Sequence, residues 1–313
     1  MSVATEHVTT TRRRRVVQPL VLLATFMWST NYLLALPLLD AFTPLQLTFV
    51  RWSLGLPLLV VAAWAIERPA CRTIRRDWWR HLLASATGVV LYNMLNYAAL
   101  DLTGPANAAV VNAVNPAVIA IGAWLVLRVR VRRAQMIGLA LSLVGVVLVI
   151  SRGSIATLVA MDVNTGELLV LLAVVCWAVY SITGRTLTTP PISSVAVQAA
   201  ISLILLGPFA ATSDLYDANL TAQDWIWLAL LVLFPTCLAF VLWNVGVQIL
   251  GPTAAGVYIN TMPVFTTAMA VGLGVQDVSW SLIVGGAIVV IGVLIATVRR
   301  SPRKSVPLSA TSP

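Results

Sequence analysis

The chain has 313 residues, of which 59% are hydrophobic and 10% are charged, and its formal net charge is +9. Soluble proteins carry about 25% charged residues, so 20 Lys and Arg with 11 Asp and Glu are too few to cover the water-facing surface of a chain this long. Together with a mean hydropathy of +0.91, this leaves a multi-spanning membrane protein as the class that fits.

Ten apolar stretches follow one another along the chain, each close to the roughly 20 residues that a helix needs to cross a bilayer. The first is too long for a signal peptide, so we expect it to remain as a helix. The polar ends, residues 1–11 and 301–313, are expected to be disordered. The predicted spans cover residues 17–38, 44–66, 78–99, 104–127, 132–151, 165–186, 193–212, 224–247, 251–273 and 278–298.

The basic residues predict the orientation of these spans. Lys and Arg near span ends are retained in the cytoplasm, and alternating the ten spans puts 18 of the 20 basic residues on one side. No aromatic or glycine-rich nucleic-acid module accompanies them, so we explain them by topology rather than by nucleic-acid binding. Both termini are therefore predicted to be cytoplasmic, in an inner or plasma membrane. The five basic clusters are Arg12 to Arg15; Arg68, Arg72, Arg75, Arg76 and Arg80; Arg128, Arg130, Arg132 and Arg133; Arg185; and Arg299, Arg300, Arg303 and Lys304.

The two halves of the sequence repeat each other. A shift of 147 residues lays Gly104-Pro105 on Gly251-Pro252 and Pro116 on Pro263, and a shift of 149 lays Trp28 on Trp177. Because each unit has five spans, the second must enter the membrane from the opposite side. This predicts an all-α fold of two inverted five-helix repeats, which suits alternating access. The predicted domains are a tail over 1–16, repeats over 17–151 and 165–298, and a tail over 299–313.

Catalysis is not supported by the residues present. The two histidines, His7 and His81, lie in the tail and at a helix end, so no nucleophile has a base within a span. No pair of acids falls inside the spans, no His, Cys and acidic cluster has metal-ligand spacing, and no P-loop is present. We therefore expect neither an enzyme nor a metal or cofactor.

Neutral polar and aromatic side chains recur at helical spacing on six spans. Each single amide or hydroxyl is explained as well by hydrogen bonding between helices as by a ligand site. The whole set, in matching places of both halves, favours a cavity that binds a small molecule. The predicted substrate-binding residues of this set are Trp28, Asn31, Tyr32, Tyr92, Asn93, Asn96, Tyr97, Asn112, Asn115, Trp177, Tyr180, Ser181, Trp243, Asn244 and Tyr258.

Arg51 is the only ionisable residue well inside a predicted span, and Gln198 is its counterpart in the second repeat. A charge in hydrocarbon needs a partner. Two interpretations are open: Arg51 binds a substrate carboxylate or phosphate, or it makes a structural bond near the outer end of its helix. Every carboxylate lies at or beyond the end of a span, which disfavours cationic substrates and favours neutral, zwitterionic or anionic ones. Aromatic rings can still hold an ammonium group.

Proline and glycine predict where helices bend and pack. Pro116 and Pro263 mark the fourth and ninth spans as hinges, or else as static kinks. Small residues on the fifth and tenth spans suit close helix packing, within the chain or between copies, so a monomer and a homodimer are both open. These small residues are Gly138, Ser142 and Gly145, and Ser281, Gly285 and Gly292.

The ten spans, the two five-span copies, the paired Trp28 and Trp177, and the Gly-Pro and Pro positions resemble the EamA-type transporters of the drug/metabolite transporter superfamily. The resemblance covers residues 17–298. It implies a central cavity lined by spans one to four and six to nine, with spans five and ten at the sides. Its members export amino acids and other metabolites, and the aromatic residues here are similar to those of amino-acid exporters. The scarcity of basic residues in the cavity disfavours phosphorylated sugars.

The sequence thus predicts a secondary transporter of the cell membrane, which exports amino acids or similar small metabolites and has a small-molecule substrate and the lipid bilayer as its partners. One alternative is a drug or metabolite exporter of broader range. Another is a non-transporting membrane scaffold or receptor, against which the short loops argue.

Overall fold

In a computed structural model, residues 2–100, 102–103, 105–154, 156, 164–210, 220–274 and 277–297 can be described. Their regular structure is entirely helical. The predicted tail over 299–313 lies outside the described residues. In the first repeat the helices are α1 (Ser2–Ala35), η1 (Leu36–Asp40), α2 (Pro44–Ala62), η2 (Ala63–Glu67), α3 (Cys71–Arg76), α4 (Trp78–Ala84), η3 (Ser85–Leu91), α5 (Tyr92–Leu100), α6 (Pro105–Asn112), α7 (Asn115–Leu127) and α8 (Arg133–Ile150).

The helices of the second repeat follow in chain order. They are α10 (Thr165–Thr186), α11 (Pro191–Ala210), α12 (Ala222–Leu231), η4 (Val232–Leu238), α13 (Ala239–Leu250), α14 (Pro252–Gly256), η5 (Val257–Thr261), α15 (Met262–Gly272) and α16 (Trp280–Thr297).

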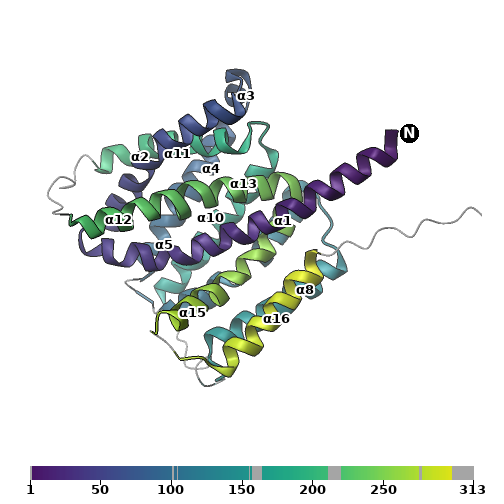
Figure 1. Cartoon of the computed structure of the whole chain (residues 1–313), viewed down its shortest axis with the longest axis vertical. Helices are drawn as coiled ribbons and strands as arrows, with labels where there is room; N and C mark the ends of the chain where they lie inside the picture. The colour runs from purple at the N-terminus through teal and green to yellow at the C-terminus, as the bar shows by residue number, and fades with distance from the viewer. Residues whose placement is uncertain are drawn as a thin grey trace, which may run out of the picture.

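Helix α1 corrects the expectation of a disordered amino-terminal end. It begins at Ser2 and runs to Ala35, and it extends beyond the other helices in Figure 1. Residues 2–18 contain neither glycine nor proline, so nothing in them stops the helix of the first span from continuing.

Eight of the described helical segments are long and apolar enough to cross a membrane. The runs over 78–100 and 105–127 are not among them. The first carries Asn93 and Asn96, whose amides lower its hydropathy, and the second is interrupted at Ala113 and Val114. Ten spans and cytoplasmic termini therefore stay predictions.

The helix boundaries follow the 147-residue register of the sequence repeat. Helices α8 and α16 begin and end 147 residues apart, as do the π-helical turns η3 and η4. Helices α7 and α15, whose first turns contain Pro116 and Pro263, also begin 147 residues apart, and each follows an interruption of the α-helix. The α-helix is thus interrupted at the matching place in each repeat, directly before the proline.

Helices α8 and α16 lie side by side at one edge of the bundle (Figure 1). A Cβ atom added at Gly138 would lie 2.3 Å from the carbonyl oxygen of Gly292, and one added at Gly145 would lie 2.6 Å from that of Gly285. The two helices therefore run antiparallel, and each glycine contacts the counterpart of the other. Two repeats related by a two-fold axis perpendicular to these helices meet in this way. The small residues pack within one chain.

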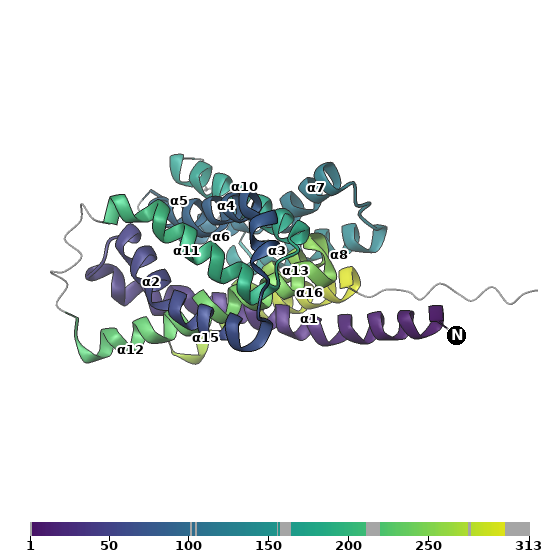
Figure 2. The ribbon, with the colours of Figure 1, turned by 90° about the horizontal axis from the view of Figure 1, so that it is seen from above.

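The remaining helices are also arranged in pairs, with one helix of each repeat on either side of the bundle. In Figure 2, α1, α12 and α15 lie along one face, and their counterparts α10, α4 and α7 lie along the opposite face. Large apolar side chains point outward from the bundle, for example Trp64, which is 73% exposed, and Ile204, which is 74% exposed. Such a surface fits hydrocarbon rather than water.

Two carboxylates of the first repeat close one side of the bundle by binding the second repeat. Glu67 accepts hydrogen bonds from the backbone N–H groups of Ile192 (2.9 Å) and Ser193 (2.8 Å), at the start of α11. Asp77 accepts from the N–H groups of Thr188 (2.6 Å) and Thr189 (3.2 Å). The amino terminus of a helix favours negative charge. Both loops were predicted to be cytoplasmic.

The environment of Asp77 has two opposing effects on its pKa. Burial raises the pKa, but the hydrogen bonds from Thr188, Arg80 and Thr189 outweigh it, so the pKa lies below its ordinary value of 3.8. The ionised form is therefore the one that the folded protein stabilises.

Replacing Gly138 by alanine is expected to destabilise the folded protein by about 1–3 kcal/mol, because the new Cβ meets backbone atoms of α16 that cannot move separately. Thermal unfolding in detergent measures this. Gly207→Ala on α11 is the control, because a Cβ there meets nothing within 4 Å. Equal melting temperatures for both variants would contradict the close packing of α8 on α16.

Asp77→Asn is expected to destabilise the protein at neutral pH by roughly 1.5–3 kcal/mol, the value of hydrogen bonds to a charged group. The lowered pKa sets the sign of the pH effect: the contribution is fully present above about pH 4 and is lost as the pH falls through the folded pKa. Thermal unfolding should therefore separate wild type from variant more at pH 7 than at pH 3. Asp224→Asn is the control, because Asp224 bonds Thr221 of its own helix end. A difference between wild type and Asp77→Asn that is the same at both pH values would contradict the ionised contact.

Candidate functional site

A pocket lies between the two repeats; its cavity volume, the space open to the centre of a water molecule, is about 60 Å³. Its residues come from the predicted spans one, two, three, four, six, eight and nine, and none comes from five or ten. The lining residues are Trp28, Asn31, Arg51, Tyr92, Asn93, Asn96, Tyr97, Asn115, Trp177, Pro235, Phe240, Ile259 and Met262.

The two repeats line this pocket with different chemistry. Every amide, the guanidinium and both phenols come from the first repeat, whereas the second contributes an indole and apolar side chains. The repeat register pairs Asn93 with Phe240 and Asn115 with Met262. The pocket therefore has a polar wall and an apolar wall, which suits an amphipathic small molecule.

Arg51 defines one end of the pocket. Helix α2 begins with a capping box between Thr43 and Gln46, and Arg51 follows two turns later. Its side chain is 2% exposed, and no carboxylate of the described residues lies within 4 Å of it.

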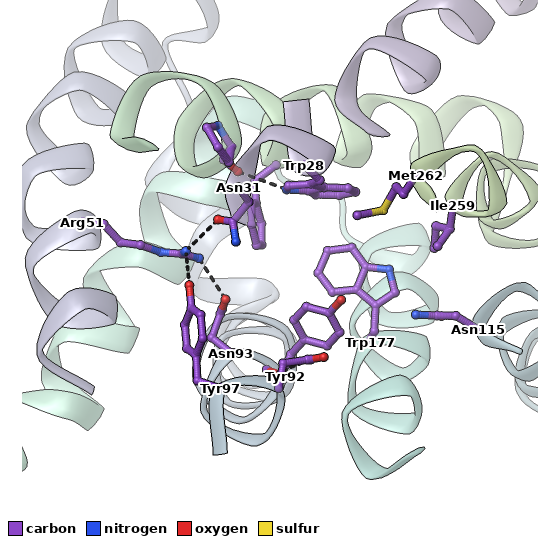
Figure 3. A pocket seen from close by; sticks show the side chains of 13 residues that line it. Trp28, Asn31, Arg51, Tyr92, Asn93, Tyr97, Asn115, Trp177, Ile259 and Met262 are labelled. Carbon is purple, nitrogen blue, oxygen red and sulfur yellow. Dashed lines mark hydrogen bonds between the residues drawn. The ribbon is translucent and has the colours of Figure 1, made fainter. Parts of the chain in front are cut away.

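The guanidinium of Arg51 is held by three neutral oxygens (Figure 3). Its Nη1 donates to Asn31 Oδ1 and to the Tyr97 hydroxyl, each at 3.3 Å, and its Nη2 donates to Asn93 Oδ1 at 2.9 Å. Asn93 is itself fixed, because its Nδ2 donates to the carbonyl oxygen of Val89 at 2.6 Å. The Nε of Arg51 has no hydrogen-bond partner. The positive charge is thus positioned by dipoles and is not neutralised by an acid.

Aromatic rings form the middle of the pocket. Trp28 and Trp177, the matched pair of the two repeats, meet edge to face with ring centroids 5.0 Å apart. Trp177 also packs on Tyr92 at 4.8 Å, and Trp28 on Phe240 at 5.5 Å. The Trp28 Nε1 donates to the carbonyl oxygen of Pro235 at 3.0 Å. These contacts fix flat apolar surfaces that can hold an apolar or aromatic group.

Asn115 lies at the other end, across the rings from Arg51 (Figure 3). It is 1% exposed, and its Oδ1 has no hydrogen-bond partner. The residue begins α7, directly after the interruption at Ala113 and Val114. The interruption of the fourth predicted span therefore places the amide of Asn115 at this end of the pocket.

A second hollow lies next to the pocket, on the side of the bundle opposite Glu67 and Asp77. Tyr97 lines the pocket and also lines this hollow, which is formed by residues 39–44 and Gln46. That loop was predicted to lie outside the cell. Asn96 belongs to the polar wall of the pocket, and Asn112 binds it: Asn112 Nδ2 donates to Asn96 Oδ1 at 3.3 Å.

Several residues predicted for substrate binding lie behind this pocket. The Tyr180 ring stacks on Trp177 at 4.9 Å, and its hydroxyl accepts from Asn244 Nδ2 at 2.6 Å. Trp243 packs on Trp177 at 5.5 Å. Ser181 and Tyr258 are buried and do not line the pocket. The side chain of Tyr32 lies outside the described residues.

Sequence reasoning missed the apolar wall, namely Pro235, Phe240, Ile259 and Met262. None of these side chains has a polar group that distinguishes it from ordinary core. The repeat register was the signal in the sequence that could have found the apolar wall. It pairs Ile259 with Asn112, which was a predicted site residue, and Pro235 with Gly88.

Known proteins resemble this chain along most of its length. It matches the EamA-like transporter family over residues 17–151 and 164–298. It is 26% identical to the uncharacterized transporter YyaM of Bacillus subtilis, over 82% of this chain and 85% of that protein. It is also 26% identical to the aromatic amino acid exporter YddG of Ancylobacter novellus, over 88% of this chain and 94% of that protein.

A solved crystal structure has the same fold, with a TM-score of 0.73 at 24% sequence identity, over 90% of this chain and 96% of that chain. The family match covers both repeats, and the members of the family are transporters rather than enzymes. The apolar helices fit the same assignment. The chain therefore belongs to the EamA-like transporter family and is a multi-pass transporter of the cell membrane.

Proposed function

We propose that this protein is a secondary transporter that exports amino acids with apolar or aromatic side chains. The observation that carries the proposal is the Arg51 guanidinium, a buried cation with only neutral partners at one end of an aromatic pocket. A relative named as an aromatic amino acid exporter aligns over 88% of the chain and supports this substrate class.

The chemistry of the pocket matches the parts of such an amino acid. Its carboxylate accepts from Arg51, where a charge-assisted hydrogen bond contributes roughly 1.5–3 kcal/mol. Its side chain lies against Trp28, Trp177 and Phe240, and its ammonium group is held by ring faces and by amide oxygens of the polar wall. A substrate with only a positive charge finds no carboxylate among the lining residues.

We further propose alternating access by exchange of the two repeats, with both termini in the cytoplasm and ten spans. Asp77 binds the second repeat, whereas its counterpart Asp224, 147 residues later, bonds Thr221 of its own helix end. One side is thus held closed, whereas Asp224 makes no matching contact with the first repeat among the residues that the structure describes. The interruptions before Pro116 and Pro263 are the proposed hinges.

Flux into proteoliposomes tests the proposal. Purified protein is reconstituted, and uptake of radiolabelled L-phenylalanine, L-leucine and L-lysine is measured with and without a proton or sodium gradient. We expect saturable flux of phenylalanine and leucine and much weaker flux of lysine. Absence of saturable flux for all three, with correctly folded protein, contradicts the amino-acid proposal, and transport of toxic apolar compounds instead would favour the exporter of broader range.

Arg51→Met is expected to raise KM for L-phenylalanine by about 10–100-fold, because it removes charged hydrogen bonds to the carboxylate. Arg51→Lys keeps the charge but loses the planar set of donors, so its KM should lie between those of wild type and Arg51→Met. Arg72→Met is the control, because Arg72 is exposed on α3. If both methionine variants transport like wild type, Arg51 has only the structural role.

Trp28→Ala is expected to reduce phenylalanine flux more than tenfold, because it opens the aromatic wall and removes the bond to Pro235. Trp64→Ala, at a tryptophan that is 73% exposed, is the matched control and should transport normally. Detergent gel filtration of both variants checks folding. Unchanged flux in Trp28→Ala would show that the ring only packs.

A further inference from the structure

Gln198 is a buried amide without a partner. It lies on α11, its side chain is 0% exposed, and neither its Nε2 nor its Oε1 has a hydrogen-bond partner. Burying an amide in this way costs free energy, and leucine at the same place would avoid that cost. An unpaired buried polar group therefore points to a second state in which the group is used.

The repeat register relates Gln198 to the Arg51 cluster. Gln198 lies 147 residues after Arg51, and Asn244 lies 147 residues after Tyr97. Tyr180 lies 149 residues after Asn31, by the shift that pairs the two tryptophans. Two of the three residues that bind the guanidinium thus have polar counterparts in the second repeat, and the third, Asn93, corresponds to Phe240. We call Gln198, Tyr180 and Asn244 the second polar cluster.

Contacts with the π-helical turn η3 connect the members of this cluster. Ser85 Oγ donates to the carbonyl oxygen of Gln198 at 2.8 Å. Gly88 lies in the same turn, and the Tyr180 ring occupies the space where its Cβ would be. The Tyr180 hydroxyl then accepts from Asn244 at 2.6 Å. The second polar cluster is therefore gathered around one turn of the first repeat.

The two clusters differ in how far their bonds are complete. Arg51 donates three hydrogen bonds, whereas Gln198 makes none with its side chain. Trp28 donates to Pro235, whereas the Nε1 of its counterpart Trp177 has no partner. Arg51 thus lacks a partner only at Nε, whereas Gln198 lacks one at both polar atoms of its side chain.

We propose that the second polar cluster is a second substrate subsite, which opens toward the side that Glu67 and Asp77 close. The proposal rests on the proposed function, because it takes alternating access from there. It assigns a different head-group chemistry to the two subsites. Arg51 has only donors and binds a carboxylate, whereas the Gln198 amide has both a donor and an acceptor. Its Nε2 donates to the carboxylate of a zwitterionic amino acid, and its Oε1 accepts from the ammonium group.

Thiol labelling tests whether the second polar cluster opens. Gln198→Cys is made in a background in which Cys71, Cys176 and Cys237 are replaced by serine, and a membrane-impermeant maleimide is added to inside-out or right-side-out vesicles. We expect labelling from the cytoplasmic side, slowed at least threefold by L-phenylalanine. Ser202→Cys, one turn further along α11 and also 0% exposed, should stay unlabelled. Labelling from the outside alone, or no labelling of Cys at 198 from either side, overturns the proposal.

Flux measured from each side tests the ligand chemistry. Gln198→Leu should raise KM for L-phenylalanine about tenfold from the cytoplasmic side, as expected for one lost bond to a charged group. KM measured from the outside should equal that of wild type within error. The melting temperature should not be lower than that of wild type. Ser202→Ala should leave both KM values unchanged.

The competitor 3-phenylpropionate, which lacks the ammonium group, should inhibit from the outside at least tenfold better than from the cytoplasmic side. Equal effects of Gln198→Leu on both sides, or equal inhibition from both sides, overturn the assignment. If wild-type protein carries no amino acid, the proposed function fails, whereas the labelling at position 198 still decides whether the cluster opens.

Discussion

The Arg51 guanidinium is a full positive charge inside a bundle of apolar helices, and three neutral oxygens hold it there without removing its charge. A buried charge of this kind is costly unless its donors are satisfied. The amides and the phenol around it therefore have to lie on facing helices, which orients α1, α2 and α5 about one point. The geometry of the pocket follows, because the same three helices provide its polar wall.

The close contact of α8 with α16 relates the two repeats by a two-fold axis. Each position around Arg51 therefore has an equivalent position in the second repeat. Gly138 and Gly145 each meet the counterpart of the other, as a two-fold axis requires, and the pair of tryptophans meets in the middle of the bundle. Symmetry of the backbone does not extend to the side chains. Glu67 and Asp77 close one side, and Asp224 bonds within its own helix end on the other.

Much of the fold could be predicted from the sequence, because apolar length and repeat spacing act locally. The register of 147 residues reproduces the bounds of α8 and α16, and Pro116 and Pro263 follow the interruptions. Nine of the predicted residues line the pocket. The contacts of Asp77 with Thr188 could not be predicted, because they depend on how the repeats dock. Tyr180 and Asn244 were predicted to line the pocket, because helical spacing does not show how deeply a side chain is buried; in the structure they bond each other behind the rings.

The polar and apolar walls give the duplicated fold a direction that symmetry alone lacks. A gene duplication supplies two equal walls, and a pocket with equal walls would hold an amphipathic molecule in two opposite orientations. Here the repeat register pairs polar Asn93 with apolar Phe240, and polar Asn115 with apolar Met262. The polar head group of an amphipathic molecule would therefore be favoured at one wall only. The second repeat has no charged residue at the position equivalent to Arg51, because Gln198 stands there. A second arginine at that position would have made both ends alike. The same substitutions that make the pocket specific therefore make the two sides of the transporter chemically different.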